Sequence, residues 1–207
     1  MRAVMSPVPP EILVWRRRIG ADRWDEMWEG VLHMGPAPNG DHQELEYALE
    51  HYLRSHWCPR VQGRVQHQRN VSPLAEGWQQ NYRIPDLVLV TPASRGIDRN
   101  EFFEGAPSAA VEIKSPDDET YEKLAFYAAL GVPEVWVIDG NSKELELFTL
   151  REGRYEKVAA DAAGWIRSST TGVCLRSCPA GEHPAGDQGG KLELRVGDDA
   201  STCATVP

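Results

Sequence analysis

Two apolar, strand-like runs that each carry one acidic residue constrain the fold of this chain more than any other feature. Residues 84–90 read Ile-Pro-Asp-Leu-Val-Leu-Val, and residues 109–115 read Ala-Ala-Val-Glu-Ile-Lys-Ser. Short runs rich in valine, isoleucine and leucine predict buried strands. A charge in such a strand is costly to bury unless it has a partner. Asp86 and Glu112 are therefore the first candidates for a functional site.

The segments around these two strands predict an α/β (α+β) fold. Residues 41–55 carry apolar side chains at helical spacing, and residues 121–130 form a second predicted helix that ends at Gly131. Strands are predicted at 61–71, at the sheet edge, and at 134–139, 143–150 and 154–158. A helix followed by strand, helix, strand and hairpin indicates a central mixed β-sheet flanked by α-helices.

The length of 207 residues predicts one domain of ordinary size with two appended segments. Residues 1–20, interrupted by prolines, look like an N-terminal extension. Residues 21–173 would form the domain, with a short helix over residues 22–28. Asp41 and Glu44 have the spacing of a helix N-cap and its capping-box partner. Residues 174–207 look like a Gly- and Pro-rich tail with one possible extra strand.

Composition excludes some functions and leaves others open. A net charge of -9 argues against a protein that coats nucleic acid non-specifically, because such binding depends on neutralising phosphates. Residues 54–69 contain four arginines and no acid, and they are either a local basic surface or a solvated strand and loop. No long apolar stretch indicates a membrane span or a signal peptide, so a cytoplasmic location is expected.

The two acids and a nearby lysine suggest a metal-dependent hydrolase. Residues two apart in a strand point the same way, so Glu112 and Lys114 should share a face. Mg²⁺ prefers oxygen ligands, which Asp86, Glu112 and the carbonyl of Ile113 could supply. Lys114 could then polarise a metal-bound water for in-line hydrolysis of a phosphodiester. The alternative is a surface Glu112–Lys114 ion pair with Asp86 as an exposed turn acid.

The chain resembles the PD-(D/E)XK nuclease superfamily and, within it, the Uma-two family of restriction-endonuclease-like proteins. The resemblance covers residues 24–155 and rests on Pro85-Asp86, Glu112-Ile113-Lys114, His42, Lys123-Leu124 with Tyr127, and residues 131–139. It implies a restriction-endonuclease-like core and a DNA endonuclease that uses Mg²⁺, with Mn²⁺ as a substitute. Its implied catalytic set is Asp86, Glu112 and Lys114, and it also implies a homodimer.

The resemblance further implies an acid on the first core helix. Glu46 is the first choice because it lies one helical turn after His42 and shares its face, while Glu44 and Glu50 remain open. His42 either contacts substrate or metal, or hydrogen-bonds the preceding loop. In many relatives a helical lysine replaces the strand lysine, and here both are present. Lys114 fits the motif better, while Lys123 is either structural or reaches the site.

Three functions are compatible with these residues. The first is a magnesium-dependent endonuclease that hydrolyses DNA. The second is a nuclease-fold module that binds DNA or a protein partner without cutting, and the third is hydrolysis of another phosphate ester. Three charges kept in apolar strands favour an active enzyme, because a module that only binds has no evident need for them.

Overall fold

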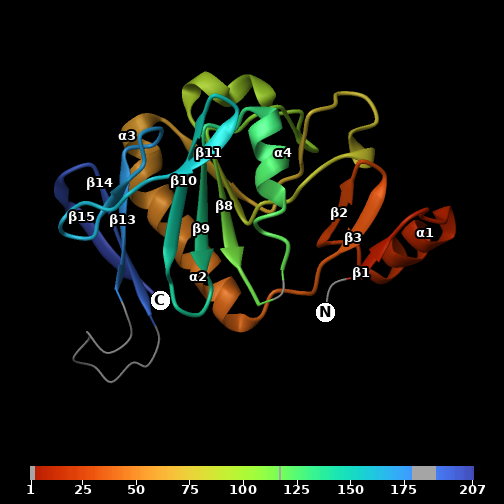
Figure 1. Ribbon diagram of the computed structural model, residues 1–207, viewed down its shortest axis with the longest axis horizontal. Helices are drawn as coiled ribbons and strands as arrows, with labels where there is room; N and C mark the ends of the chain where they lie inside the picture. Colours follow the sequence, from red (N-terminus) through yellow and green to blue (C-terminus); the bar gives the residue numbers. More distant parts are fainter. Residues whose placement is uncertain (1–2, 117, 179–189) are drawn as a thin grey trace.

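A computed structural model describes residues 3–116, 118–178 and 190–207. Its centre is a six-stranded sheet in the order β11-β10-β9-β8-β6-β4 (Figure 1). Only β8 and β9 run parallel, and the other neighbours are antiparallel. The strands are β4 (Arg64–His67), β6 (Leu87–Val90), β8 (Ala109–Lys114), β9 (Glu134–Asp139), β10 (Leu145–Arg151) and β11 (Arg154–Lys157). The predicted mixed sheet is confirmed, and β4 is its edge strand, as expected.

Helices cover both faces of this sheet, because β8 alternates its buried side chains between two apolar clusters. Val111 and Ile113 pack with α2 (Gly40–Tyr52) in the larger cluster, whereas Ala110 packs with α4 (Lys123–Leu130). Figure 1 shows α2 and α4 on opposite sides of β8 and β9. A π-helical turn (Leu53–Trp57) and α3 (Cys58–Val61) continue α2. The strand β8, with Glu112 near its end, therefore lies between the two helices.

The N-terminal region is folded and contains a hairpin where a helix was predicted. β2 (Asp25–Trp28) pairs with β3 (Val31–Met34), and β3 pairs with β1 (Ala3–Met5). Glu29 and Gly30 connect the strands with φ of 48° and 84°, the backbone of a two-residue type I′ turn. The helix expected at 22–28 was wrong because cross-strand pairing overrides local helix propensity.

The expected N-terminal extension is tied to the hairpin through α1 (Pro10–Ile19). The Arg16 guanidinium donates two hydrogen bonds to the Asp25 carboxylate, with Nη2 2.6 Å from Oδ1. Both side chains are mostly buried. Residues 1–20 are thus not a loose appendage over the part that the structure describes.

The C-terminal residues expected to form a tail contribute instead to the main core. β12 (Ile166–Arg167), β13 (Val173–Cys178), β14 (Lys191–Val196) and β15 (Asp199–Val206) form an antiparallel four-stranded sheet. Leu175, Leu192 and Leu194 are fully buried in the same apolar cluster as α2. The expected boundary at residue 174 falls inside β13. Most of the Gly- and Pro-rich segment, residues 179–189, lies outside the described residues.

Smaller elements connect the layers. β5 (Val71–Ser72) and β7 (Phe103–Glu104) form a two-stranded parallel sheet, and two 3₁₀ turns occupy Trp78–Gln80 and Pro92–Ile97. The N-cap of α2 is Asn39 rather than the expected Asp41, because the Asn39 side chain accepts a hydrogen bond from the His42 backbone N–H. Among the described residues, no helix is both long and apolar enough to span a bilayer.

Candidate active site

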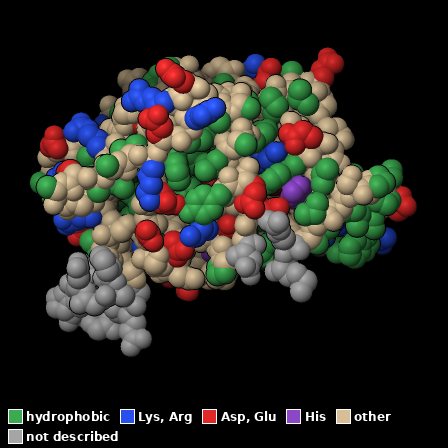
Figure 2. Space-filling view, in the orientation of Figure 1, with side chains coloured by type: hydrophobic (Ala, Val, Ile, Leu, Met, Phe, Trp, Pro, Cys, Tyr) green, Lys and Arg blue, Asp and Glu red, His purple; other side chains and the backbone are tan. Residues whose placement is uncertain are grey.

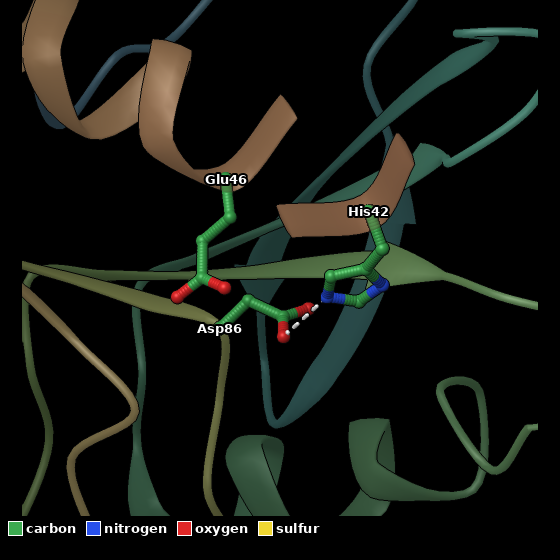
Figure 3. A group of neighbouring side chains, drawn as sticks. All are labelled: His42, Glu46 and Asp86. Carbon is green, nitrogen blue, oxygen red and sulfur yellow. Dashed lines mark hydrogen bonds and ion pairs between the residues drawn. The ribbon is translucent and has the colours of Figure 1, made fainter. Parts of the chain in front are cut away.

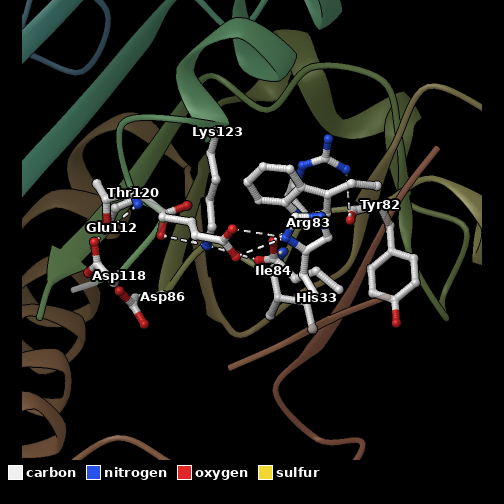
Figure 4. A network of polar contacts seen from close by, with 12 residues as sticks. His33, Tyr82, Arg83, Ile84, Asp86, Glu112, Asp118, Thr120 and Lys123 are labelled. Atoms are coloured by element: carbon white, nitrogen blue, oxygen red, sulfur yellow. Dashed lines mark hydrogen bonds and ion pairs between the residues drawn. The ribbon is translucent and has the colours of Figure 1, made fainter. Parts of the chain in front are cut away.

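A pocket of about 250 Å³ lies where the first turn of α2, the start of β6, the end of β8 and the start of α4 converge. Its floor is polar and includes Asp86, Glu112 and Lys123, while Trp24 and residues 35–38 form a more apolar wall. Figure 4 shows the polar side chains of the network around the pocket. The two acids first singled out in the sequence therefore line one pocket.

Asp86 precedes β6 and is fixed by two neighbouring elements. Its Oδ2 accepts a hydrogen bond from the Ile113 backbone N–H on β8 at 2.6 Å. Its Oδ1 lies 2.9 Å from His42 Nε2 on α2. The carboxylate thus sits at the junction of the sheet and the first core helix, which is where the pocket opens.

His42 and Glu46 project from one face of α2 toward Asp86, as Figure 3 shows. One ligand atom from each of the three side chains lies within 4.8 Å of the others, so this group could hold a metal ion. The buried Glu46 Oε1 accepts no hydrogen bond from the described residues, and His67 Nδ1 lies 3.5 Å away. An orphaned buried carboxylate oxygen is a feature that a bound cation would explain.

The electrostatics of this group also favour a cation. Burial, followed by the negative charge of Asp86, raises the pKa of Glu46 to about 7. For His42, burial alone would lower the pKa, but the hydrogen bond and charge of Asp86, with the charges of Glu46 and Glu112, raise it overall. Both residues therefore hold protons more readily than usual, and a bound cation would displace them.

Glu112 lies on the α4 side of β8 and is almost wholly buried. The Tyr127 hydroxyl donates to its Oε1 at 2.5 Å, and the Lys123 ammonium lies 3.0 Å from its Oε2. Burial raises the pKa of Glu112, an effect that the positive charge of Lys123 opposes. Glu112 lies outside the three-residue group that could hold a metal, although it borders the same pocket.

Lys123 is held by a second buried acid, Glu26, which the sequence did not single out. Glu26 Oε1 lies 2.8 Å from Lys123 Nζ and accepts the Ile84 backbone N–H at 2.8 Å. Its Oε2 accepts a hydrogen bond from Trp28 Nε1 at 2.7 Å. Burial opposes the charge on Lys123, but Glu112 and Glu26 raise its pKa above the ordinary value. The ammonium therefore stays charged.

Lys114 points into a different hollow from the one that Asp86 lines. Its Nζ lies 3.2 Å from Asp139 Oδ2, and the other neighbours in this hollow include Tyr121 and Glu146. The physical reason is register, because Lys114 faces Asp139 across the parallel β8–β9 pair. The structure therefore does not bring Lys114 to the pocket, and Lys123 occupies the position beside Glu112.

Of the remaining residues predicted for the site, some lie at the pocket and others do not. Ile113 lines the pocket and donates its backbone N–H to Asp86, while the ligand role predicted for its carbonyl stays a prediction. Glu50 forms an ion pair with Arg54 at 2.7 Å, and Glu44 is exposed, so Glu46 is the acid of this helix that faces Asp86. Glu26 could have been suspected only if residues 25–28 had been read as a strand.

The basic tract of residues 54–69 is largely neutralised by acids. Arg54 pairs with Glu50, Arg60 with Asp199 at 2.9 Å, and Arg69 with Asp98 at 3.3 Å. On the face shown in Figure 2, basic and acidic side chains are likewise interspersed. The tract offers ion-paired arginines rather than the uninterrupted basic surface considered from the sequence.

Comparison with known proteins identifies the family of this chain. Residues 15–176 match the Uma2 family, described as "Putative restriction endonuclease". This chain belongs to the Uma2 family. The crystal structure of a protein from Anabaena variabilis ATCC 29413, described as a "putative nuclease belonging to DUF820", is similar with a TM-score of 0.55. The two share 18% sequence identity over 71% of this chain and 83% of that chain, a likeness that shows the fold. No curated protein matches the chain.

Family membership indicates the general class of reaction to consider for the pocket. The Uma2 description supports a nuclease, and the fold is nuclease-like. Within this family member, His42, Asp86, Glu112 and Lys123 line one pocket, and Glu46 lies directly behind it beside His42 and Asp86. Acids that could hold a divalent cation and a lysine beside them are the components of metal-assisted hydrolysis.

Proposed function

We propose that this protein is a metal-dependent endonuclease that hydrolyses DNA phosphodiester bonds in the cytoplasm. One observation carries the proposal: His42 and Asp86, two members of the three-residue group able to hold a cation, line the same pocket as the buried Glu112–Lys123 pair. Membership of the Uma2 family supports a nuclease. Metal-assisted phosphodiester hydrolysis uses a cation at the phosphate oxygens and a fixed positive charge nearby. The pocket offers donor atoms for the first and Lys123 for the second.

His42, Glu46 and Asp86 would hold the metal ion. The Glu46 oxygen that accepts no hydrogen bond and the mixed oxygen and nitrogen donors fit Mg²⁺ or Mn²⁺, and an imidazole ligand favours Mn²⁺ of the two. A bound ion would lower the pKa of its water and polarise the phosphate. Glu112 and the Ile113 carbonyl border the same pocket and remain candidates for additional ligands.

Lys123 would stabilise the negative charge that grows on the phosphate. An ammonium group has three hydrogen-bond donors, and Glu26 and Glu112 accept two of them. The third is left for a water molecule or a phosphate oxygen at the pocket. Because the lysine is mostly buried and held from two sides, its charge is already in position when substrate arrives.

Plasmid nicking tests this proposal. Supercoiled DNA is incubated with the full chain in Mg²⁺, in Mn²⁺ or in EDTA, and the same assay is run with Asp86→Asn and Glu46→Gln. We expect nicking in either metal, none in EDTA, and a loss of about 100-fold or more in both variants. Calorimetric titration with Mn²⁺ should show weaker binding by both variants.

The outcomes separate the competing functions. DNA binding without cleavage in every metal would favour the nuclease-fold module that only binds, and would contradict the proposal. Cleavage that survives both substitutions would mean that another site or a contaminant is responsible. A homodimer, which two-strand cleavage would use, is part of the proposal only through family resemblance, and light scattering at assay concentration tests it.

A further inference from the structure

A second cavity, of about 320 Å³, adjoins the pocket that contains Asp86. Gln68 and Ile84 line both cavities, and the consecutive residues Arg23 and Trp24 line one each. The Gln68 side-chain amide also donates a hydrogen bond to Glu46 at 3.4 Å. Gln68 therefore connects the second cavity with the group that could hold a metal.

Its walls carry uncommitted hydrogen-bonding groups. The side-chain amides of Asn70, Gln79 and Gln80 make no hydrogen bonds within the described part of the chain, and all three line the cavity. An amide offers both a donor and an acceptor, so several of them together suit the edge of a nucleobase. Trp78 and Tyr82 add aromatic surface to the same wall.

The charge of this cavity is opposite in sign to that of the whole chain. Three arginines and two aspartates line it, which gives +1 (3 minus 2), whereas the chain carries -9. The Asp25 carboxylate is committed to Arg16. Arg17 is highly exposed, and its ion pair with Asp22 is long, at 3.8 Å, so that it can be exchanged for a phosphate. Arg23 makes no ion pair with any described residue. Two guanidinium groups are thus available at the rim.

We propose that this second cavity binds an unpaired nucleotide of the DNA strand that flanks the phosphodiester to be cut. The inference rests on the proposed nuclease function and adds a substrate class, single-stranded DNA. Arg17 and Arg23 contact backbone phosphates, while Asn70, Gln79 and Gln80 contact the base. A concave hollow of this size takes a small-molecule-sized group, and a base enters it only when it is free of its partner strand.

Fluorescence anisotropy with a labelled oligonucleotide tests the inference. The Asp86→Asn chain is used in Mg²⁺ so that hydrolysis does not interfere, and single-stranded DNA is compared with its duplex. Arg17→Glu with Arg23→Glu is compared with Arg151→Glu with Arg154→Glu, two exposed arginines on the β10–β11 hairpin that cause the same change in charge. Circular dichroism checks the folding of both double variants.

We expect the chain to bind the single strand more tightly than the duplex. The Arg17 and Arg23 pair should weaken binding by about tenfold or more and lower the salt dependence by roughly 0.7 for each lost phosphate contact. The control pair should change binding by less than about twofold. Gln79→Ala with Gln80→Ala should change the relative affinities for homopolymeric oligonucleotides, each made of one kind of base. The salt dependence of binding should stay unchanged, because amides do not neutralise phosphate.

Equal effects of the two arginine pairs, tighter binding of duplex, or no binding by the parent chain would each overturn the inference. Plasmid nicking by the wild-type chain reports separately on the proposed function. Nicking together with equal effects of the arginine pairs would refute only the second cavity. Selective loss of binding in a chain that never cuts DNA would refute only the nuclease.

Discussion

Lys123 is the residue whose position most affects the chemistry proposed here. It lies on α4, yet its ammonium reaches between an acid on β8 and an acid on β2. Lys114 lies two residues after Glu112 on the same strand, and its ammonium pairs with Asp139 instead. Both lysines were candidates from the sequence, but their surroundings differ, and only Lys123 borders the pocket that Asp86 lines.

Replacing each lysine with methionine distinguishes their roles. Lys123→Met should lower kcat by about 100-fold or more, because it removes the fixed positive charge beside the phosphate. Lys114→Met should change kcat by less than about twofold, since it removes a partly exposed ion pair. Nicking rates at saturating metal provide the measurement. A larger loss in the Lys114 variant would contradict the assignment and restore the strand lysine as the catalytic one.

Glu26 acts on the pocket through Lys123. Its orientation is supported by a hydrogen bond from Trp28, whose ring stacks on His33 with centroids 4.0 Å apart and lies 4.2 Å from the Arg83 guanidinium carbon. Glu26→Gln should lower kcat by about tenfold, because the lysine loses one of the two charges that hold it. The pKa of Lys123 should fall as well.

A positioning role for Glu26 predicts that metal affinity stays unchanged. Titration calorimetry with Mn²⁺ should give the same Kd for Glu26→Gln and wild type, since Glu26 is outside the group able to hold a metal. Glu29→Gln, in the exposed turn of the same hairpin, is the matched control. It removes only a 3.6 Å ion pair with Arg83 and should leave both kcat and Kd unchanged. A weakened Kd in the Glu26 variant would mean that the whole pocket had been disturbed.

At the scale of elements, the hairpin of β2 and β3 delivers Glu26 to the pocket. Its turn places Gly30 at a φ of 84°, a conformation that costs an L-residue about 1–2 kcal/mol. Gly30→Val should therefore lower the free energy of unfolding by roughly that amount and reduce activity, because the hairpin loses its geometry. Urea denaturation followed by circular dichroism gives the first quantity.

Gly96→Ala is the comparison for the turn variant. Gly96 lies in a 3₁₀ turn with ordinary backbone, and an added Cβ there meets no neighbour within 4 Å. The free energy of unfolding should change by less than about 0.5 kcal/mol, and nicking should be unaffected. If the Gly30 variant were equally well tolerated, the hairpin would not depend on this turn.

The elements that were predicted correctly from sequence are those whose burial alone fixes their pattern. β6, β8, α2, α4 and β9 each present apolar residues at strand or helix spacing. Residues 25–28 failed because their strand depends on pairing with β3 rather than on their own periodicity. Glu112 and Lys114 were predicted to share one strand face and one site, but the structure places them in different cavities. Glu112 contacts Lys123, and Lys114 lies opposite Asp139. These partners depend on how α4 and β9 pack against β8, which cannot be read from residue spacing along the chain.

At the scale of the whole molecule, the site lies between layers that the chain assembles from distant segments. The C-terminal sheet completes the apolar cluster beneath α2, and α2 carries His42 and Glu46. The N-terminal hairpin supplies Glu26, and β6 and β8 supply Asp86 and Glu112. Burying several acids together at this site costs free energy, because each carboxylate loses its hydration. The cost should lower the free energy of unfolding of the whole protein.

This cost predicts an unusual pH dependence for the metal-free protein. Glu46 has an ordinary pKa of 4.5 and a folded value of about 7, so between these values the folded state holds a proton that the unfolded state releases. The free energy of unfolding should therefore fall as pH rises through this window, by about 3 kcal/mol from Glu46 alone. The raised pKa of His42 acts in the same direction.

Urea denaturation in EDTA across this pH window measures the effect, with Glu46→Gln as the variant that should flatten the curve. Mn²⁺ should restore stability mainly at the upper end, because there it replaces a missing proton at the carboxylate. The wild-type curve should then approach that of the variant when saturating metal is present. A stability that rises with pH in EDTA, or a Glu46→Gln curve as steep as the wild type, would show that Glu46 is ionised in the folded protein without help from a cation.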